Sequence, residues 1–370
     1  MYELTIPASS SVVDVFIIDN GCRTGGFPAH LVLDPVLPGY EDLGKAPSYS
    51  FLIRHYATGR YLLFDLGVRK NWETAYPPAF KKALNDLGMT IQAGEDTADV
   101  LGSNGVSLNN VDSIVFSHHH FDHTGDTSKF PKSTSIVVGP GYKETYLPGW
   151  PANGKQIETT SDIYEGRVVT ELVFDQNDPK VSALGGFQAY DFFGDQSLYF
   201  LSTPGHTTGH LSALARTTSV EGQSTFMFLG GDIVHTSAVF RPTAKYPLPQ
   251  SLPHPLHKPY SGHTCPGDIF AKIHRHYNGT DGGRMARTTP FCKVTGPEDD
   301  LAEAQRSADK LSGFDGEGSI FTIWAHDASL LDVIEFFPQQ ANEWKAKGWK
   351  KDGHWRWLGR CILADSEAKL

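Results

Sequence analysis

The stretch Ser117-His118-His119-His120-Phe121-Asp122-His123 completes a short apolar run and contains the pattern H-x-H-x-D-H. Imidazole and carboxylate groups are ligands for zinc and neighbouring divalent ions. Residues two apart on an extended segment point the same way, so His118 and His120 can hold one ion. Asp122 and His123 follow where the chain turns, and they can face a second ion about 3.5–4 Å away. The pattern therefore predicts a two-metal site at the end of a buried strand.

Three later apolar runs end in the same kinds of residue. His206 closes Thr-Pro-Gly-His, Asp232 closes Gly-Gly-Asp, and His326 lies in Trp-Ala-His-Asp. Polar residues end strands in many proteins, but this repetition is typical of an α/β scaffold that gathers ligands at its strand ends. The four clusters together supply five His and two Asp, which suits two ions that share one carboxylate. Zinc is the expected metal, with manganese or iron as alternatives.

Charge and composition limit the classes of partner. The chain has 370 residues and a formal net charge of −10, which disfavours nucleic acid and anionic membranes. No apolar run has the length of a membrane span, and residues 1–19 lack the pattern of a signal peptide. The four cysteines are scattered and form no CxxC pair, which indicates free thiols in a reducing compartment. We expect a cytoplasmic protein that acts on a small molecule.

The periodicity of the apolar residues predicts a single α/β domain over residues 1–370. Helical spacing appears over 72–87, over 300–311 and from residue 329 onward. The segments 48–55 and 61–66 flank a turn and predict a hairpin. The expected strands are 12–19, 48–55, 61–66, 113–117, 135–138, 168–174, 187–193, 198–202, 226–229 and 320–324.

Regular patterning stops between residues 236 and 318, where seven prolines lie from Pro242 to Pro266. Long irregular segments in compact folds are often functional, so we expect a Pro-rich insertion over the site; an ordinary surface loop is the alternative. Its aromatic side chains would line an apolar pocket above the metals. They could instead pack the insertion against the rest of the fold, or against a second subunit in a homodimer. The candidate pocket residues are His235, Phe240, Tyr246, His257 and Tyr260.

These motifs resemble the metallo-β-lactamase superfamily, and within it the dinuclear branch that contains N-acyl homoserine lactonases. The resemblance covers nearly the whole chain, from Asp65 in Leu-Phe-Asp-Leu-Gly to His326. The segment 49–67, Gly-Asp-Ile-Val-His at 231–235 and Phe-Arg-Pro at 240–242 are similar to fungal members, including lactamases that open benzoxazolinone rings. The resemblance implies a four-layer αββα sandwich with the metals at one edge between the sheets.

The resemblance also implies a role for each ligand. In this reading, the first ion is held by His118, His120 and His206, and the second by Asp122, His123 and His326. Asp232 would bridge the two ions, and Asp65 would orient a metal-bound imidazole.

Three positions depart from that pattern. His119 and His210 fall outside the ligand set, so we expect a structural role for each. Bacterial lactonases of this branch usually place a tyrosine shortly after the bridging aspartate, where it helps to polarise the substrate carbonyl. Here Asp232 is followed by Ile233, Val234 and His235. The ligand set is unaffected, but acyl homoserine lactone is not carried over as the substrate.

A dinuclear site of this kind predicts a hydrolase. Hydroxide becomes available near neutral pH because coordination lowers the pKa of water to roughly 7, and it attacks a carbonyl carbon while Asp122 takes up and returns the proton. The leading hypothesis is the opening of a compact, apolar lactone or lactam ring. Thioester hydrolysis, as in glyoxalase-type or polyketide-releasing enzymes, is the alternative. Metal-dependent oxidation and nucleic-acid processing are further readings, and the acidic composition disfavours the second.

Overall fold

The computed structural model describes residues 4–154, 158–258, 261–279 and 283–362, and two six-stranded sheets form its centre. In the first sheet β1, β4 and β5 are antiparallel, and β5, β7, β8 and β9 run parallel to one another. In spatial order its strands are β1 (Val13–Ile18), β4 (Ser50–His55), β5 (Arg60–Phe64), β7 (Val111–Val115), β8 (Ser135–Val138) and β9 (Val169–Glu171).

The second sheet is antiparallel except for its last pair, β14 and β18, which run parallel. A parallel pair needs a crossover connection, and here the crossover contains the whole segment between residues 229 and 320. In spatial order the strands are β10 (Val181–Leu184), β11 (Phe187–Asp191), β12 (Leu198–Ser202), β13 (Leu211–Val220), β14 (Gln223–Leu229) and β18 (Ile320–Ile323).

The central strands are apolar on both faces, because each sheet is covered on both sides. Phe51 and Ile53 of β4 pack with Phe200 of β12 in the core between the sheets. Their neighbours Leu52 and Leu201 point the opposite way, into the outer cores of the first and second sheet respectively. Successive residues of one strand thus pack in two different cores.

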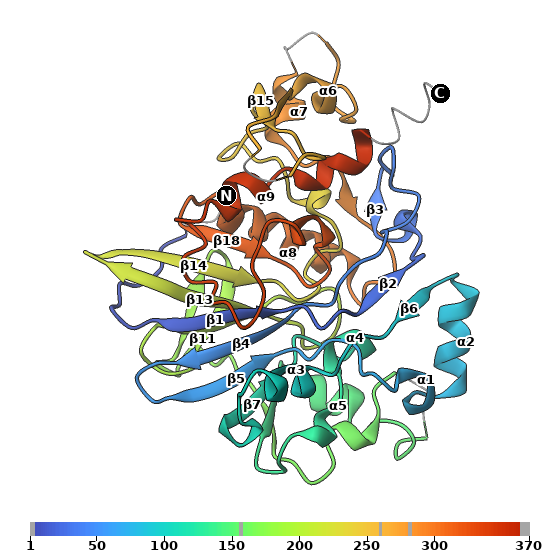
Figure 1. Ribbon diagram of the computed structural model, residues 1–370, viewed down its shortest axis with the longest axis vertical. Coiled ribbons are helices and arrows are strands. Elements are labelled where there is room, and N and C mark those ends of the chain that lie inside the picture. Colours follow the sequence, from blue (N-terminus) through green and yellow to red (C-terminus); the bar gives the residue numbers. More distant parts are fainter. Residues whose placement is uncertain (1–3, 155–157, 259–260, 280–282, 363–370) are drawn as a thin grey trace.

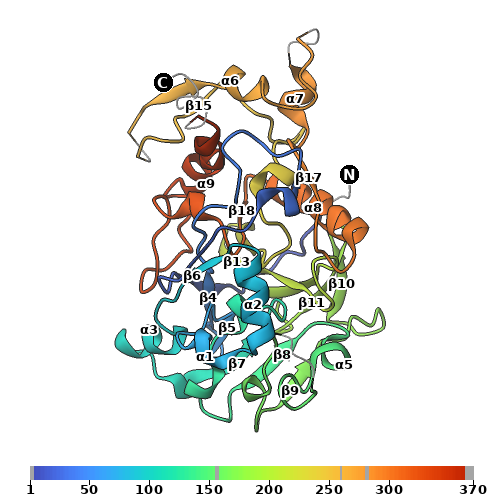
Figure 2. The same cartoon turned by 90° about the vertical axis from the view of Figure 1, so that its right-hand side faces the viewer.

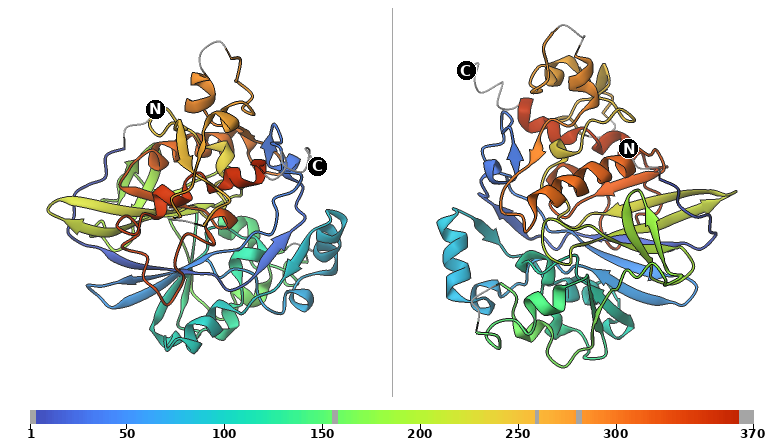
Figure 3. Two further views of the ribbon diagram at one scale, coloured as in Figure 1. Left: turned by 45° about the horizontal axis from the view of Figure 1, so that its top comes forward. Right: turned by 180° about the vertical axis from the view of Figure 1, so that it is seen from behind.

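Helices close the two outer faces. The first sheet is covered by α3 (Thr97–Ser103) and α5 (Tyr142–Tyr146), and the second by α8 (Leu301–Asp315). Figure 1 shows α3 and α5 below the strands and α8 above them, and the view from behind in Figure 3 has the same order. The fold is therefore the expected four-layer αββα sandwich.

Two of the expected helices differ in the structure. The segment 72–87 forms two helices, α1 (Trp72–Ala75) and α2 (Pro78–Asp86), rather than one. Pro77 and Pro78 cause the break, because proline excludes the helical conformation for the residue before it and is accepted only in a first turn. Among the described residues from 328 to 362, the expected helix is replaced by short elements: α9 (Trp349–Gly353) and the 3-10 turns η6 (Ala328–Leu330) and η7 (Arg356–Leu358).

The segment 236–318 has three parts. A 3-10 turn, η5 (Ser237–Val239), begins it, and α8 at its end belongs to the outer layer. Between them lies a small subdomain that projects from the top of the molecule in Figures 1 and 2. The subdomain contains β15 (Ser251–Pro253), β16 (Thr264–Pro266), α6 (Asp268–Ala271) and α7 (Arg284–Thr288), whereas β17 (Lys293–Val294) follows it and packs against α8.

The N-terminal region completes one side of the molecule. The strands β2 (Arg23–Gly25) and β6 (Thr90–Gln92) pair beside α2, and β3 (Leu33–Asp34) pairs with β17. Gly26 has φ 77°, and a Cβ there would lie 2.3 Å from the carbonyl oxygen of Gly88, so only glycine permits this approach.

Two further findings concern the environment of the chain. All four cysteines are buried and free. Among the described residues, no helix combines the length and the apolar character that crossing a membrane requires.

Candidate metal centre

The candidate ligands converge because the strands that carry them end at one edge of the sandwich. β7 leads into His118, and the short helix α4 (Phe121–Thr124) carries Asp122 and His123. His206 follows β12, Asp232 follows β14 and His326 follows β18. Strand ends at one edge of a sheet are a rigid platform for side chains from distant parts of the sequence.

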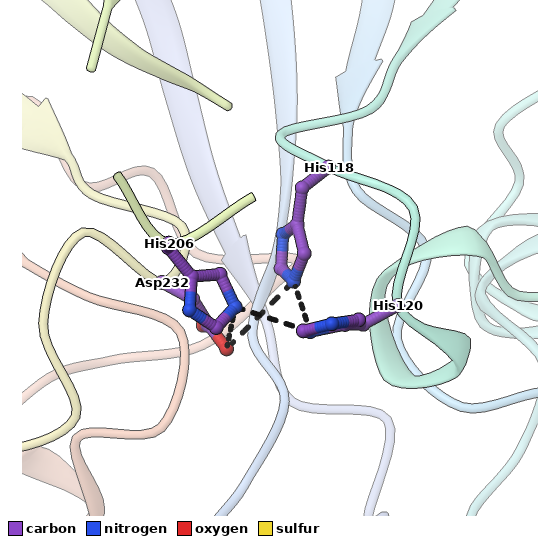
Figure 4. Close-up of side chains that lie close together, drawn as sticks. All are labelled: His118, His120, His206 and Asp232. Atoms are coloured by element: carbon purple, nitrogen blue, oxygen red, sulfur yellow. Dashed lines mark hydrogen bonds and ion pairs between the residues drawn. The ribbon is translucent and has the colours of Figure 1, made fainter. Parts of the chain in front are cut away.

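Three imidazoles and one carboxylate form the first group that could hold an ion: His118, His120, His206 and Asp232. The Nδ1 atom of His120 lies 2.8 Å from Nε2 of His118 and 3.1 Å from Nε2 of His206. The Oδ2 atom of Asp232 lies 3.9 Å from Nε2 of His118 and 3.8 Å from that of His206. Figure 4 shows these atoms directed toward one point between the four side chains.

Asp122, His123 and His326 form the second group. The carboxylate of Asp122 lies 3.8 Å from Nε2 of His123 and 3.5 Å from Nε2 of His326. Asp232 contacts this group as well, with Oδ1 at 3.3 Å from His123 and Oδ2 at 3.1 Å from His326. Asp232 therefore lies between the two groups, in the position that a bridging ligand requires.

The position of Asp232 is fixed by its own surroundings. Its backbone N–H donates to Nε2 of His210, and the other nitrogen of that imidazole meets the hydroxyl of Thr203 at 2.8 Å. Gly231 has φ 56°, and a Cβ there would lie 2.7 Å from the Cβ of Ser117. His210 is thus a structural residue, as expected, and glycine before Asp232 is sterically required.

Each ligand imidazole uses its outer nitrogen to contact a neighbouring group. His123 donates from Nδ1 to Asp65 at 2.8 Å, and His326 donates from Nδ1 to the carbonyl of Pro47 at 2.7 Å. Ser117 donates its hydroxyl to Asp65, so the same oxygen accepts from Nδ1 of His118. With a proton on its outer nitrogen, each ring can offer the lone pair of its inner nitrogen to a bound ion. Asp65 thus contacts His123 directly and reaches His118 through Ser117.

Two buried polar atoms of the cluster, Nε2 of His123 and Oδ1 of Asp232, face each other at 3.3 Å but form no hydrogen bond. Buried polar groups are nearly always hydrogen-bonded, so orphaned atoms need an explanation. Burial and the neighbouring imidazoles also lower the pKa of His118 and of His206, which keeps both rings in the neutral form that metals bind. This donor set of nitrogens and carboxylate oxygens fits divalent metal ions such as zinc.

Two carboxylates at the site were not expected from the sequence. Glu298 accepts from Nδ1 of His206 at 2.7 Å, and Oε1 of Glu158 lies 3.5 Å from Nε2 of His120. Burial raises the pKa of both carboxyl groups. Neither residue follows an apolar run or belongs to a motif, so the sequence pattern contains no signal for them.

His119 points away from the two ligand groups around Asp232. Its ring stacks on Tyr146 with 3.8 Å between the centroids, and its Nε2 lies 3.5 Å from Glu158. Stacking on a buried aromatic ring is consistent with the structural role that was expected.

A cavity of about 270 Å³ opens onto the cluster. Its floor includes His120, His206, His326, Asp122 and Asp232, and His235 lies beside them with Nε2 3.5 Å from Asp232. The walls are largely apolar and come from the N-terminal region and α2. They are formed chiefly by Phe27, Val32, Leu43, Phe80, Leu84, Leu87, Met89 and Trp324.

The prediction that aromatic residues of the insertion line the pocket was wrong for three of them. Phe240 is fully buried in the core outside the second sheet, and Tyr246 packs on His354 and Trp355. His257 stacks on His263 in the subdomain. Tyr260 lies outside the described residues, and His235 does line the cavity. From the segment 236–318, Pro297 and Glu298 are the described residues that line it.

The comparisons with known proteins agree with this geometry. Residues 43–218 match the family model of the metallo-beta-lactamase superfamily. The chain is 40% identical to Gamma-lactamase FDB1 of Fusarium pseudograminearum, over 98% of this chain and 86% of that protein. It is 37% identical to Cytochrome P450 monooxygenase mpaDE of Penicillium roqueforti, over 95% of this chain but only 38% of that protein.

A solved structure shares the fold. It is that of a quorum-quenching N-acyl homoserine lactone hydrolase, with a TM-score of 0.54 and 16% identity, covering 90% of this chain and 99% of the other. Sequence identity over the full length, the matched family model and the shared fold all lead to one assignment. The chain belongs to the metallo-β-lactamase superfamily and is a metal-dependent hydrolase.

Proposed function

We propose that the chain holds two zinc ions, with manganese or iron as alternatives, and opens a small cyclic amide or ester. The observation that carries the proposal is the convergence of imidazole nitrogens and carboxylate oxygens around Asp232, where Nε2 of His123 and Oδ1 of Asp232 form no hydrogen bond. The first ion would be held by His118, His120 and His206, the second by Asp122, His123 and His326, with Asp232 shared.

The chemistry follows from what such a site supplies. Two bound zinc ions would lower the pKa of a shared water and polarise a carbonyl group. Asp122 lines the cavity, and its carboxylate would take a proton from the attacking water and return it to the leaving nitrogen or oxygen. The apolar walls would hold the ring and exclude other water. Among the described residues, the cavity contains no serine or cysteine that could act as a nucleophile.

The substrate class follows from the cavity and from one relative. A volume of about 270 Å³ with apolar walls suits a compact ring rather than a polymer. The Fusarium relative is named a gamma-lactamase, so a lactam is the first substrate to test and a lactone the second. The Penicillium relative is named a monooxygenase, but this chain spans little more than a third of that protein.

We further propose that the protein is one domain, located in the cytoplasm, that acts without nucleic acid. The four free, buried thiols support a reducing compartment. A homodimer remains a proposal that size-exclusion chromatography would test.

The test combines metal analysis with a substrate panel. Protein purified without chelator should contain two equivalents of zinc per chain. The zinc-loaded protein should hydrolyse a γ-lactam or lactone faster than a thioester, and chelation should abolish the activity. An active protein without metal would contradict the metal centre, and preference for the thioester would contradict the substrate class.

A further inference from the structure

The cavity has four polar side chains other than the candidate ligands, and two of them are acidic. They are the side chains of Thr24, Glu158, His235 and Glu298. No lysine or arginine is found among the described residues that line the cavity. A substrate that bears a carboxylate or a phosphate would therefore meet no fixed side-chain cation beside the metals, apart from any charge on His235.

The two glutamates contact different candidate ligands of the first ion, Glu158 at His120 and Glu298 at His206. Oε2 of Glu158 accepts from the backbone N–H of Phe121 at 3.3 Å, and its Oε1 faces His120. Glu298 is held by Nδ1 of His206, and its second oxygen lies 3.8 Å from Nδ1 of His235. The side chains are 16% and 3% exposed. Both charges are therefore close to the floor of the cavity and poorly screened by water.

The charges of the site leave little attraction for an anion. The ligands Asp122 and Asp232, the supporting Asp65, and the two glutamates together offer five carboxylates. Two divalent ions would supply four positive charges, and five ionised carboxylates exceed these by one before any attacking hydroxide is counted. So close to these carboxylates, an additional negative charge on the substrate is unfavourable.

We propose, on the basis of the two-ion site argued above, that Glu158 and Glu298 are specificity-determining residues that restrict this cavity to uncharged rings. Anionic lactams and lactones, and thioesters of carriers that bear carboxylate or phosphate groups, would be rejected by repulsion rather than by shape. The metals would bind the carbonyl group of a neutral or an anionic substrate alike. The two glutamates would determine which charge the rest of the substrate can carry.

The test measures binding rather than turnover, with two probes of matched shape. 4-Phenylbutyramide is neutral and 4-phenylbutyrate is anionic, and each is titrated by calorimetry into zinc-loaded protein at pH 8. The wild type should bind the amide more tightly than the carboxylate. In Glu158→Gln/Glu298→Gln the ratio of the two dissociation constants should shift by at least tenfold toward the carboxylate. The exposed pair Glu144→Gln/Glu165→Gln removes the same charge elsewhere and should leave the ratio unchanged.

Zinc content is measured for every variant, because Glu298 also supports His206. If Glu298→Gln loses zinc, the single variant Glu158→Gln becomes the test. Its ratio of dissociation constants should shift several-fold toward the carboxylate. A wild type that prefers the carboxylate, or a ratio that does not change in zinc-loaded variants, would overturn the proposal. Since neither probe needs to be hydrolysed, such a failure is distinguishable from a failure of the proposed hydrolytic function.

Discussion

The imidazoles of the centre share one arrangement, in which an outer nitrogen meets an acceptor and an inner nitrogen faces the cluster. Asp65 accepts a hydrogen bond from His123. It also accepts one from Ser117, whose hydroxyl oxygen contacts His118. Asp65 itself has φ 60°, a left-handed conformation that aspartate tolerates better than most residues. Such outer contacts fix the tautomer of a ligand and raise its basicity, and their loss typically costs about 10–100-fold in metal affinity.

The sequence could predict the seven candidate ligands because each ends an apolar run or belongs to one short motif. Glu158 and Glu298 could not be predicted in the same way. Glu158 lies in a loop, and Glu298 follows Pro297 in an irregular segment, so what places them is the tertiary contact with His120 and His206. Acceptors for metal-bound histidines have no fixed spacing, and only the folded geometry identifies them.

Among single residues, replacing Asp232 should reduce activity and zinc content more than replacing any residue outside the cluster. We expect Asp232→Ala to abolish activity and to remove at least one equivalent of zinc, because its carboxylate faces both ligand groups. His119→Ala should retain two equivalents and most of the activity, since its ring packs on Tyr146. Metal analysis and kinetics on the two variants, with circular dichroism to confirm folding, provide the comparison. Equal zinc loss in both would show that the ligand assignment is wrong.

Among the elements, short apolar strands could be predicted from sequence to within a few residues. The runs 135–138 and 198–202 coincide with β8 and β12. The longest strand, β13, was missed, because its second half, Arg-Thr-Thr-Ser-Val, is polar and is held in place by pairing with β14. Tertiary pairing there outweighs local composition.

The aromatic residues of the insertion illustrate a second limit. Composition alone cannot distinguish rings that line a pocket from rings that fill a core, and Phe240 belongs to the second kind. The cavity walls come instead from α2 and the N-terminal strands, which contribute Phe80 and Leu87. Their function in the cavity depends on where the segment 72–92 docks, which the sequence pattern does not reveal.

The apolar wall of the cavity next to α2 leads to a prediction about substrate binding. Leu87 lines the cavity and is 41% exposed, so Leu87→Ala should not disturb a core. We expect KM for the hydrolysed ring to rise about 3- to 10-fold with little change in kcat, because the lost apolar contact binds ground state and transition state alike. His257→Ala, in the subdomain, should leave both constants unchanged. A raised KM in His257→Ala, with unchanged constants in Leu87→Ala, would indicate that the insertion binds the substrate.

For the molecule as a whole, a buried ion pair joins the outer layer on the second sheet to distant parts of the chain. Arg241 lies in the first part of the crossover and Asp315 ends α8; both are buried, and they form two hydrogen bonds of 2.9 and 2.8 Å. Arg241 also donates to the carbonyl of His354, and Lys350 donates to the carbonyl of Asp315. The pair thus connects the crossover, α8 and the C-terminal segment, three parts that are distant in sequence.

The last prediction concerns this pair. Asp315→Asn should lower the free energy of unfolding by about 3–5 kcal/mol, because the charge of Arg241 remains buried without its partner. Although burial alone would raise the pKa of Asp315, Arg241 lowers it well below its ordinary value. Asp315 therefore stabilises the folded protein above its unfolded pKa, and this contribution disappears as pH falls toward its folded pKa.

Urea unfolding between pH 7 and pH 2.5, at fixed zinc concentration, would measure both effects. The gap between wild type and Asp315→Asn should be full at pH 7 and should narrow below about pH 4, the range in which the unfolded carboxyl group titrates. Arg241→Met/Asp315→Leu provides the control. Replacing both partners with apolar side chains avoids the unpaired charge, so much of the stability should return. A single variant within 1 kcal/mol of wild type at pH 7 would mean that the layer is held by apolar packing alone.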